Sequence, residues 1–139
     1  SLDVAASLNG LGNVAFSQGD LAAARDFHLR ALEIRENKAP GSLDVAASLN
    51  NLGNVAQALG DLAAASDYHL RALEIRENNA PGSLDVAASL NNLGHVEYSQ
   101  GDLSAAHEYY LHALEIENSS IARIGCLSRW CQVTHTGVA

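Results

Sequence analysis

The sequence predicts an all-α protein, a superhelical solenoid of three antiparallel helix pairs followed by a C-terminal capping helix. The first observation is a repeat, because the phrase SLDVAASLN begins at Ser1, Ser42 and Ser83, 41 residues apart each time. A fixed period of this size is typical of stacked-repeat architectures. The second is that apolar residues recur at spacings of three and four, as on one helix face. The third is that aromatic residues make up only 5% of the chain, so the core must consist of small side chains that let helices approach closely.

The second unit shows how the two helices of a pair are defined. Ser42 is a suitable N-cap for the first helix, and Asp44 in its first turn favours the positive end of the helix dipole. Gly60 is suited to end this helix, and Asp61 is suited to cap the second one. Each helix then carries one apolar stripe. The stripes consist of Leu43, Ala46, Leu49, Leu52, Gly53 and Ala56, and of Leu62, Ala65, Tyr68, His69, Ala72, Leu73 and Ile75.

The period divides the chain into three units and a tail. Residues 1–41, 42–82 and 83–118 form the units, and residues 119–139 form the tail. The segment NNAPG breaks the second helix of the second unit before the cycle restarts. One helix pair cannot bury its apolar side alone, so the units must stack, and about three are usually needed for a stable array.

The tail, SSIARIGCLSRWCQVTHTGVA, contains no acidic residue, both cysteines and the only Trp. Two interpretations stay open. The tail is vector-encoded or out-of-frame sequence, or it is a closing helix over residues 120–132 that packs on the preceding helix and covers the third unit. Ser119 or Ser120 would cap that helix, and Gly125 would weaken it by up to about 1 kcal/mol. Its apolar side would consist of Ile121, Ile124, Leu127 and Cys131 or Trp130.

Charge and hydropathy argue against several classes of function. The net charge of −8 argues against binding of nucleic acid, which needs a basic face. No stretch of 18 apolar residues and no signal peptide is found, so we expect no membrane association. Two cysteines make neither a disulfide framework nor a complete zinc site, which favours a reducing, cytoplasmic setting. Because the first residue is not Met, we expect a piece of a longer protein.

Eight positions of the second unit form a pattern: Leu-Gly in the first helix, Gly-Asp at the turn, then small, aromatic and Ala-Leu positions in the second helix. They are Leu52, Gly53, Gly60, Asp61, Ala65, Tyr68, Ala72 and Leu73. This pattern resembles the tetratricopeptide repeat (TPR). The 41-residue length exceeds the usual length of about 34 and resembles the repeats of kinesin light chains and of bacterial regulatory arrays. The resemblance implies a right-handed superhelix whose concave wall is formed by the first helix of each pair.

The resemblance also implies which side chains line the concave wall. An Asn side chain both donates and accepts hydrogen bonds, so a ladder of asparagines can hold the backbone of an extended peptide. The alternative is that these asparagines bond only neighbouring helices or water. No Lys or Arg stands on the wall, so capture of a C-terminal carboxylate is not expected. The candidate peptide-binding residues are Asn9, Asn13, Phe16, Asn50, Asn54, Gln57, Asn91, His95 and Tyr98.

The histidines do not form a metal-binding pattern. His107 and His112 are five residues apart, which places them about 140° apart around a helix rather than on one face. His28 and His69 occupy an interhelix position where the third unit has Tyr110, and we expect them to be half-buried packing residues. No motif of a nucleophile, a phosphate loop or a paired-carboxylate site is found. The sequence therefore predicts no enzyme activity, no metal and no cofactor.

Charged residues of the second helices are expected on a solvated outer face. In the first unit these include Arg25, Arg30 and Arg35, together with acids at helical spacings. Ion pairs of this kind contribute a few tenths of a kcal/mol each.

The sequence predicts a non-enzymatic scaffold that binds an extended peptide or partner protein in the concave groove. Two alternatives stay open. Near-identical units without an evident N-terminal cap can form a self-associating structural module, joined through the open ends or the tail. The chain can also be a sensor arm excised from a larger signalling enzyme.

Overall fold

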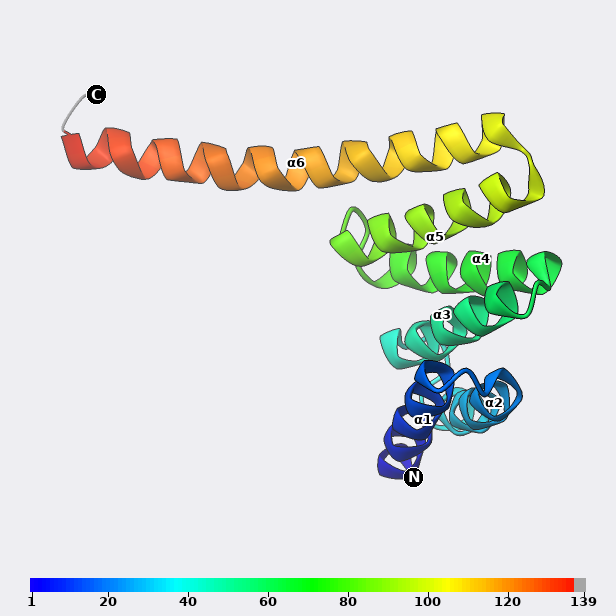
Figure 1. The fold of residues 1–139 in the computed structure, drawn as a ribbon. Coiled ribbons are helices and arrows are strands. Elements are labelled where there is room, and N and C mark those ends of the chain that lie inside the picture. The colour runs from blue at the N-terminus through cyan, green and yellow to red at the C-terminus, as the bar shows by residue number, and fades with distance from the viewer. Residues whose placement is uncertain (137–139) are drawn as a thin grey trace.

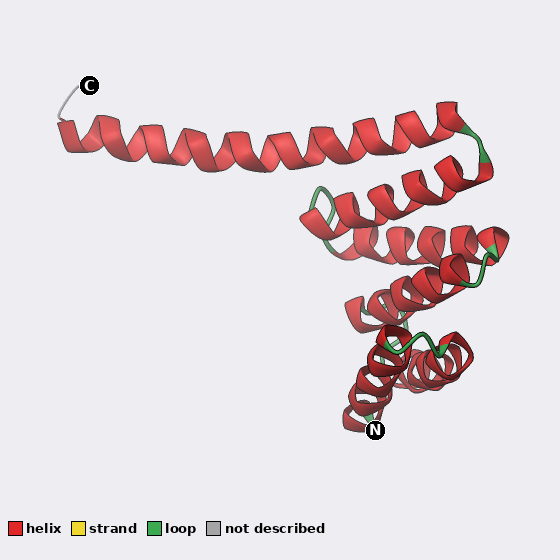
Figure 2. Ribbon diagram, viewed as in Figure 1, coloured by secondary structure: helices red, strands yellow, loops and turns green. Residues whose placement is uncertain are grey.

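The computed structural model describes the backbone of residues 1–136 and the side chains of residues 1–123. It contains six helices, which form three antiparallel pairs stacked in chain order (Figures 1 and 2). The all-α repeat fold predicted from the period is therefore confirmed. The helices are α1 (Leu2–Ser17), α2 (Leu21–Lys38), α3 (Leu43–Ala58), α4 (Leu62–Asn79), α5 (Leu84–Gln100) and α6 (Leu103–Thr136).

The predicted caps set the helix boundaries. Ser42 Oγ accepts a hydrogen bond from the backbone N–H of Val45 at 3.3 Å, and Asp61 Oδ1 accepts one from that of Ala64 at 3.1 Å. Each bond satisfies an N–H that a helix start otherwise leaves unpaired. Gly60 ends α3 with φ of +83°, a left-handed conformation that favours glycine. Equivalent Ser and Asp caps begin the other pairs.

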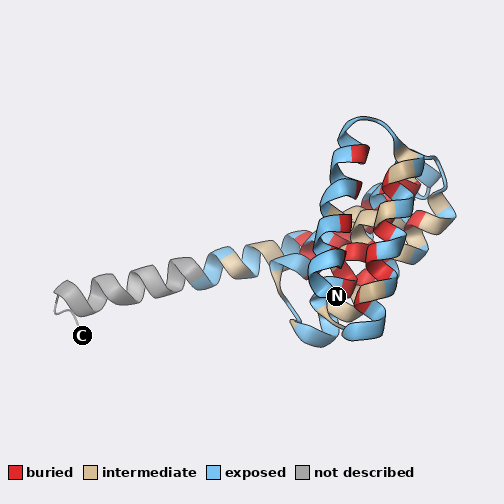
Figure 3. Cartoon of the chain, turned by 90° about the horizontal axis from the view of Figure 1, so that it is seen from below, coloured by how far each residue is buried: buried red, intermediate tan, exposed pale blue. Residues whose placement is uncertain are grey.

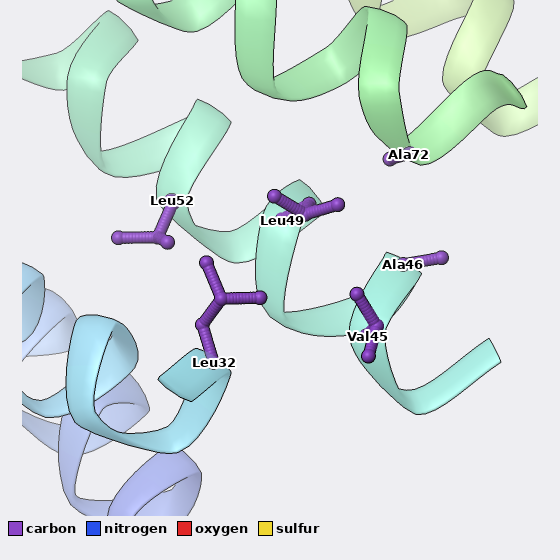
Figure 4. Packing of buried hydrophobic residues seen from close by; sticks show 6 residues of the cluster. All are labelled: Leu32, Val45, Ala46, Leu49, Leu52 and Ala72. Atoms are coloured by element: carbon purple, nitrogen blue, oxygen red, sulfur yellow. The ribbon is translucent and has the colours of Figure 1, made fainter. Parts of the chain in front are cut away.

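The core lies between the two helices of each pair and where the second helix of one unit meets the first helix of the next. Leu32 of α2 packs against Val45, Leu49 and Leu52 of α3, and these α3 side chains are at most 2% exposed. Figure 4 shows Leu32 reaching toward Leu49 and Leu52, and Figure 3 shows buried residues gathered between the helices with exposed outer sides. The predicted stripe of the first helix is confirmed except at Leu43, which is 47% exposed because it begins the helix.

The predicted seventh helix is wrong, because residues 119–136 continue α6 without a break. In the earlier units, Pro40–Gly41 and Pro81–Gly82 follow the second helix, and both glycines have positive φ. In the third unit, Ala122–Arg123 stands 41 residues after Pro81–Gly82. Neither residue breaks a helix, so the chain continues where the earlier units turn back. Figure 1 shows α6 running back along α5 and past its N-terminal end.

The predicted packing of the tail onto the third unit fails at the position that the structure describes. Ile121 is 67% exposed, and Ser119 and Ser120 lie inside α6 instead of capping a new helix. The other side chains of the predicted apolar side, Ile124, Leu127, Trp130 and Cys131, lie outside the described side chains. Among the described residues, neither α6 nor any other helix is long and apolar enough to cross a membrane.

Candidate functional site

The first helices of neighbouring units are joined by asparagine pairs. Asn51 Nδ2 of α3 donates to Asn9 Oδ1 of α1 at 2.8 Å, and Asn92 Nδ2 of α5 donates to Asn50 Oδ1 of α3 at 2.7 Å. Asn9 Oδ1 also lies 3.1 Å from Nδ1 of His28. Because a carbonyl oxygen only accepts, His28 carries its proton on Nδ1 in this arrangement.

These bonds divide the predicted asparagine ladder into two groups. Asn9 and Asn50 bond neighbouring helices, as the alternative interpretation anticipated. Asn91 is also engaged, since its Nδ2 donates to Glu117 Oε1 of α6 at 3.2 Å. Asn13 and Asn54 are exposed and form no side-chain hydrogen bond to any residue that the structure describes. Those two amides retain their donors and acceptors.

Asn13 and Asn54 border a small hollow between α1 and α3. The hollow has a volume of about 50 Å³, which is room for a few water-sized groups. Phe16 lies at its edge and is 39% exposed. The hollow therefore brings two amides without side-chain hydrogen bonds close to an aromatic ring. The lining residues are Asn13, Phe16, His28, Asn51, Asn54 and Val55.

The predicted residues of α3 and α5 form a second group. Gln57 Nε2 and His95 Nδ1 are hydrogen-bonded across the junction between these helices. The amide nitrogen only donates, so His95 Nδ1 accepts. Ser99 Oγ donates to the backbone carbonyl of His95 at 2.9 Å, and Tyr98 is 62% exposed. His95 is thus tethered, while Tyr98 presents an open aromatic surface beside it.

The structure corrects the placement of Arg35. Instead of lying on a solvated face, it is 9% exposed, and its Nη1 donates to Ser48 Oγ at 2.8 Å and to the backbone carbonyl of Asp44 at 3.2 Å. Arg76 makes the same two kinds of bond one unit later. The next unit covers this side of the helix, so the period of a single helix does not reveal the burial. We call Arg35 and Arg76 the junction arginines.

The histidine packing position is confirmed, but the predicted half-burial is wrong. His28 and His69 are 1% and 0% exposed. Each ring lies over a glycine of the preceding helix, and a Cβ added at Gly12 or Gly53 would meet ring atoms at 2.6 Å or 2.5 Å. The third unit has Tyr110 over its corresponding glycine.

Burial changes the acid–base behaviour of both rings. Desolvation, and secondarily the positive charge of Arg76, lowers the pKa of His69 from 6.5 to about 4. Desolvation and then Arg35 lower the pKa of His28 in the same direction. Neither ring nitrogen of His69 has a hydrogen-bond partner among the described residues. No three His, Cys, Asp or Glu side chains in the described part of the chain could together hold a metal ion.

The repeat pattern can be compared with known families. The sequence pattern of the tetratricopeptide repeat matches twice, over residues 3–78 and 44–119. The chain belongs to the tetratricopeptide repeat family. TPR domains are generally protein-interaction modules and typically are not catalytic. No curated protein matches this TPR chain.

Solved TPR structures share its fold. The chain is similar to BtubC (BKLC) from P. vanneervenii, with a TM-score of 0.80 and 29% identity over 84% of this chain and 48% of that one. It is similar to a Podosopora anserina protein described as a kinesin light chain with nearly identical TPR-like repeats (TM-score 0.74, 17% identity, 82% and 55% covered). It is also similar to the N-terminal domain of stress-induced protein-1 from C. elegans (TM-score 0.69, 23% identity, 83% and 85% covered). The chain thus spans about half the length of the first two.

Proposed function

We propose that this TPR chain is a non-enzymatic scaffold that binds an extended peptide segment of a partner protein along the first helices. The observation that carries the proposal is the pair Asn13 and Asn54. Both amides are exposed, both lack a bond to described residues, and both border the same hollow as Phe16. Because the two cysteines of the chain, Cys126 and Cys131, are too few for a disulfide framework, we place this binding in the reducing cytoplasm.

The chemistry of these side chains favours a peptide backbone over a charged ligand. An Asn amide can donate to a peptide carbonyl and accept from a peptide N–H, which is what an extended strand offers at every second residue. Phe16 and Tyr98 are 39% and 62% exposed and can pack against apolar side chains. No Lys or Arg stands among the candidate residues, so recognition of an anionic group is not part of the proposal.

The roles within the candidate set differ. We assign direct peptide contact to Asn13, Asn54 and the aromatic residues. Asn9 and Asn50 then act indirectly, because their hydrogen bonds fix the spacing between neighbouring first helices. Gln57 likewise holds His95 in place.

The test is a peptide selected against the unmodified chain from a displayed random library. Its affinity is then measured by calorimetry for the unmodified chain, for N13A/N54A, and for the control N37A, which removes an exposed Asn from α2. The double variant should bind more weakly by about 0.5–1.5 kcal/mol for each net hydrogen bond lost. The control should bind normally, and far-UV circular dichroism should be unchanged for both. Equal affinity of all three proteins would contradict the proposal.

A further inference from the structure

Both ends of the array expose side chains that are buried at the internal junctions. Val45, Leu52 and Val55 of α3 are 1–2% exposed beneath the preceding unit. Their counterparts in α1 are 49%, 50% and 54% exposed. We call this group the N-terminal face: Val4, Leu11 and Val14.

The opposite end shows the same contrast. Leu32 of α2 is 7% exposed and packs on α3, and Leu73 of α4 packs on α5. Their counterpart in α6, Leu114, is 49% exposed. We call the Leu114 side of α6 the C-terminal face. A second copy of the chain could therefore place its N-terminal face on this one, and the internal junctions show what such a contact requires.

Each internal junction has an arginine connection to a buried hydroxyl. The hydroxyls that the junction arginines Arg35 and Arg76 contact belong to Ser48 and Ser89, each 0% exposed and each 2.8 Å from a guanidinium nitrogen. Hydrogen bonds from a charged group are among the stronger ones in proteins. Ser7 of α1 holds the corresponding position on the N-terminal face and is exposed.

Each internal junction also has an asparagine pair between its first helices. Asn51 donates back to Asn9, and Asn92 donates back to Asn50. Every internal junction thus combines an apolar contact with two kinds of hydrogen bond. The arginine donates to the following unit, and the asparagine donates to the preceding unit.

Both connections are absent from the residues that would meet in an end-to-end contact. Gly10 stands where the later units have Asn51 and Asn92, and Glu117 stands where the earlier units have the junction arginines. Glu117 accepts from Asn91 of its own unit. In an added junction, its carboxylate would replace a guanidinium opposite a backbone carbonyl and a hydroxyl. The carboxylate and the backbone carbonyl are both acceptors, and burying a charge without an opposite charge beside it is costly.

We propose that residues 10 and 117 determine end-to-end recognition between copies of this chain, and that Gly10 and Glu117 prevent a second copy from stacking although both end faces are apolar. The two positions act as specificity determinants of repeat stacking. At internal junctions the arginine and asparagine at the equivalent positions bond the neighbouring unit, and Gly10 and Glu117 cannot form these two bonds. A substituted Asn fits at position 10, since a Cβ there would meet no atom within 4 Å.

The experiment measures mass against concentration by light scattering for the unmodified chain and for G10N/E117R. The unmodified chain should stay monomeric. The double variant should associate, with an association constant at least about tenfold higher, since bonds to charged groups contribute that much or more. Two controls are matched: E115R makes the same charge change on the exposed outer side of α6, and G10A adds a side chain without an amide. Both should stay monomeric.

One-sided chains test the direction of association and protect against a misfolded double variant. G10N/L114D leaves only the N-terminal face, and E117R/L11D leaves only the C-terminal face. Each should be monomeric alone, and the two should form a 1:1 complex when mixed. Association of the unmodified chain to the same extent would overturn the proposal. So would a failure of the one-sided chains to pair while their helicity stays normal.

Discussion

Replacing Gly53 by Ala tests whether the buried histidine rings fix the distance between the helices of a pair. Gly53 lies in α3, directly beneath the ring of His69 in α4. A Cβ at this position would be 2.5 Å from Cε1, 2.6 Å from Nε2 and 2.8 Å from Nδ1 of that ring. His69 is 0% exposed, so the ring cannot turn aside into solvent.

Two effects of opposite sign set the magnitude. Ala is preferred over Gly inside a helix by about 1 kcal/mol. Overpacking a filled interior typically costs about 1–3 kcal/mol, and simultaneous overlap with three ring atoms points to the upper part of that range. We therefore expect the Gly53→Ala variant to lose about 2 kcal/mol in its free energy of unfolding.

The assay is urea unfolding followed by circular dichroism. Gly10→Ala is the matched control, since Gly10 also lies inside a helix but a Cβ there would meet no atom within 4 Å. That variant should be more stable by up to about 1 kcal/mol. In a background carrying His69→Ala, the Gly53→Ala change should also become stabilising. If Gly53→Ala in the unmodified chain were as stable as the parent, the ring contact would not control the packing.

Two further predictions concern the buried ring of His69 and the arginine bond between the second and third units. The pKa of His69 is about 4 in the folded state, against 6.5 for a histidine in water. The unfolded chain therefore binds the proton more readily. The free energy of unfolding should fall by about 3 kcal/mol as the pH is lowered from about 6.5 to 4. Unfolding measured across that range should show this loss, and His69→Tyr should reduce it. Arg76→Met should cost about 1.5–3 kcal/mol because the buried Ser89 hydroxyl loses a charged donor. Arg71→Met, which removes only the exposed 3.1 Å ion pair to Glu36, should cost less than about 1 kcal/mol in the same unfolding assay.

Local signals in the sequence were sufficient to predict the helix pairs. Ser42, Gly60 and Asp61 act within one turn of the chain, so their residue types predict the caps directly. The continuation of α6 beyond the third unit depends on an equally local signal, the absence of a Pro-Gly pair there. Loss of the period at residue 118 suggested a new helix, but neither Pro nor Gly stands at residues 118–123 to end α6.

Features that depend on the neighbouring unit could not be predicted from one helix at a time. Arg35 looks solvated on its own helix and is covered only when α3 packs on α2. The pairing of Asn51 with Asn9 spans 42 residues, one more than the repeat. The extra residue reflects how neighbouring units are shifted against each other in space. A comparison of residues one repeat apart does not reveal this shift. The sequence therefore located the asparagines but not which amides stay free.

The distribution of the two junction bonds has a consequence for how such an array changes length. Unit 1 has its arginine but a glycine at residue 10, and unit 3 has its asparagine but a glutamate at residue 117. Unit 2 alone carries both Asn51 and Arg76. A tandem duplication of residues 42–82 would keep the period of the repeat. The new junction between the two copies would contain both the arginine bond and the asparagine bond. Duplication of either terminal unit would leave a defective junction inside the stack. Of the three units, the middle one can therefore be copied without leaving a junction that lacks one of the two bonds.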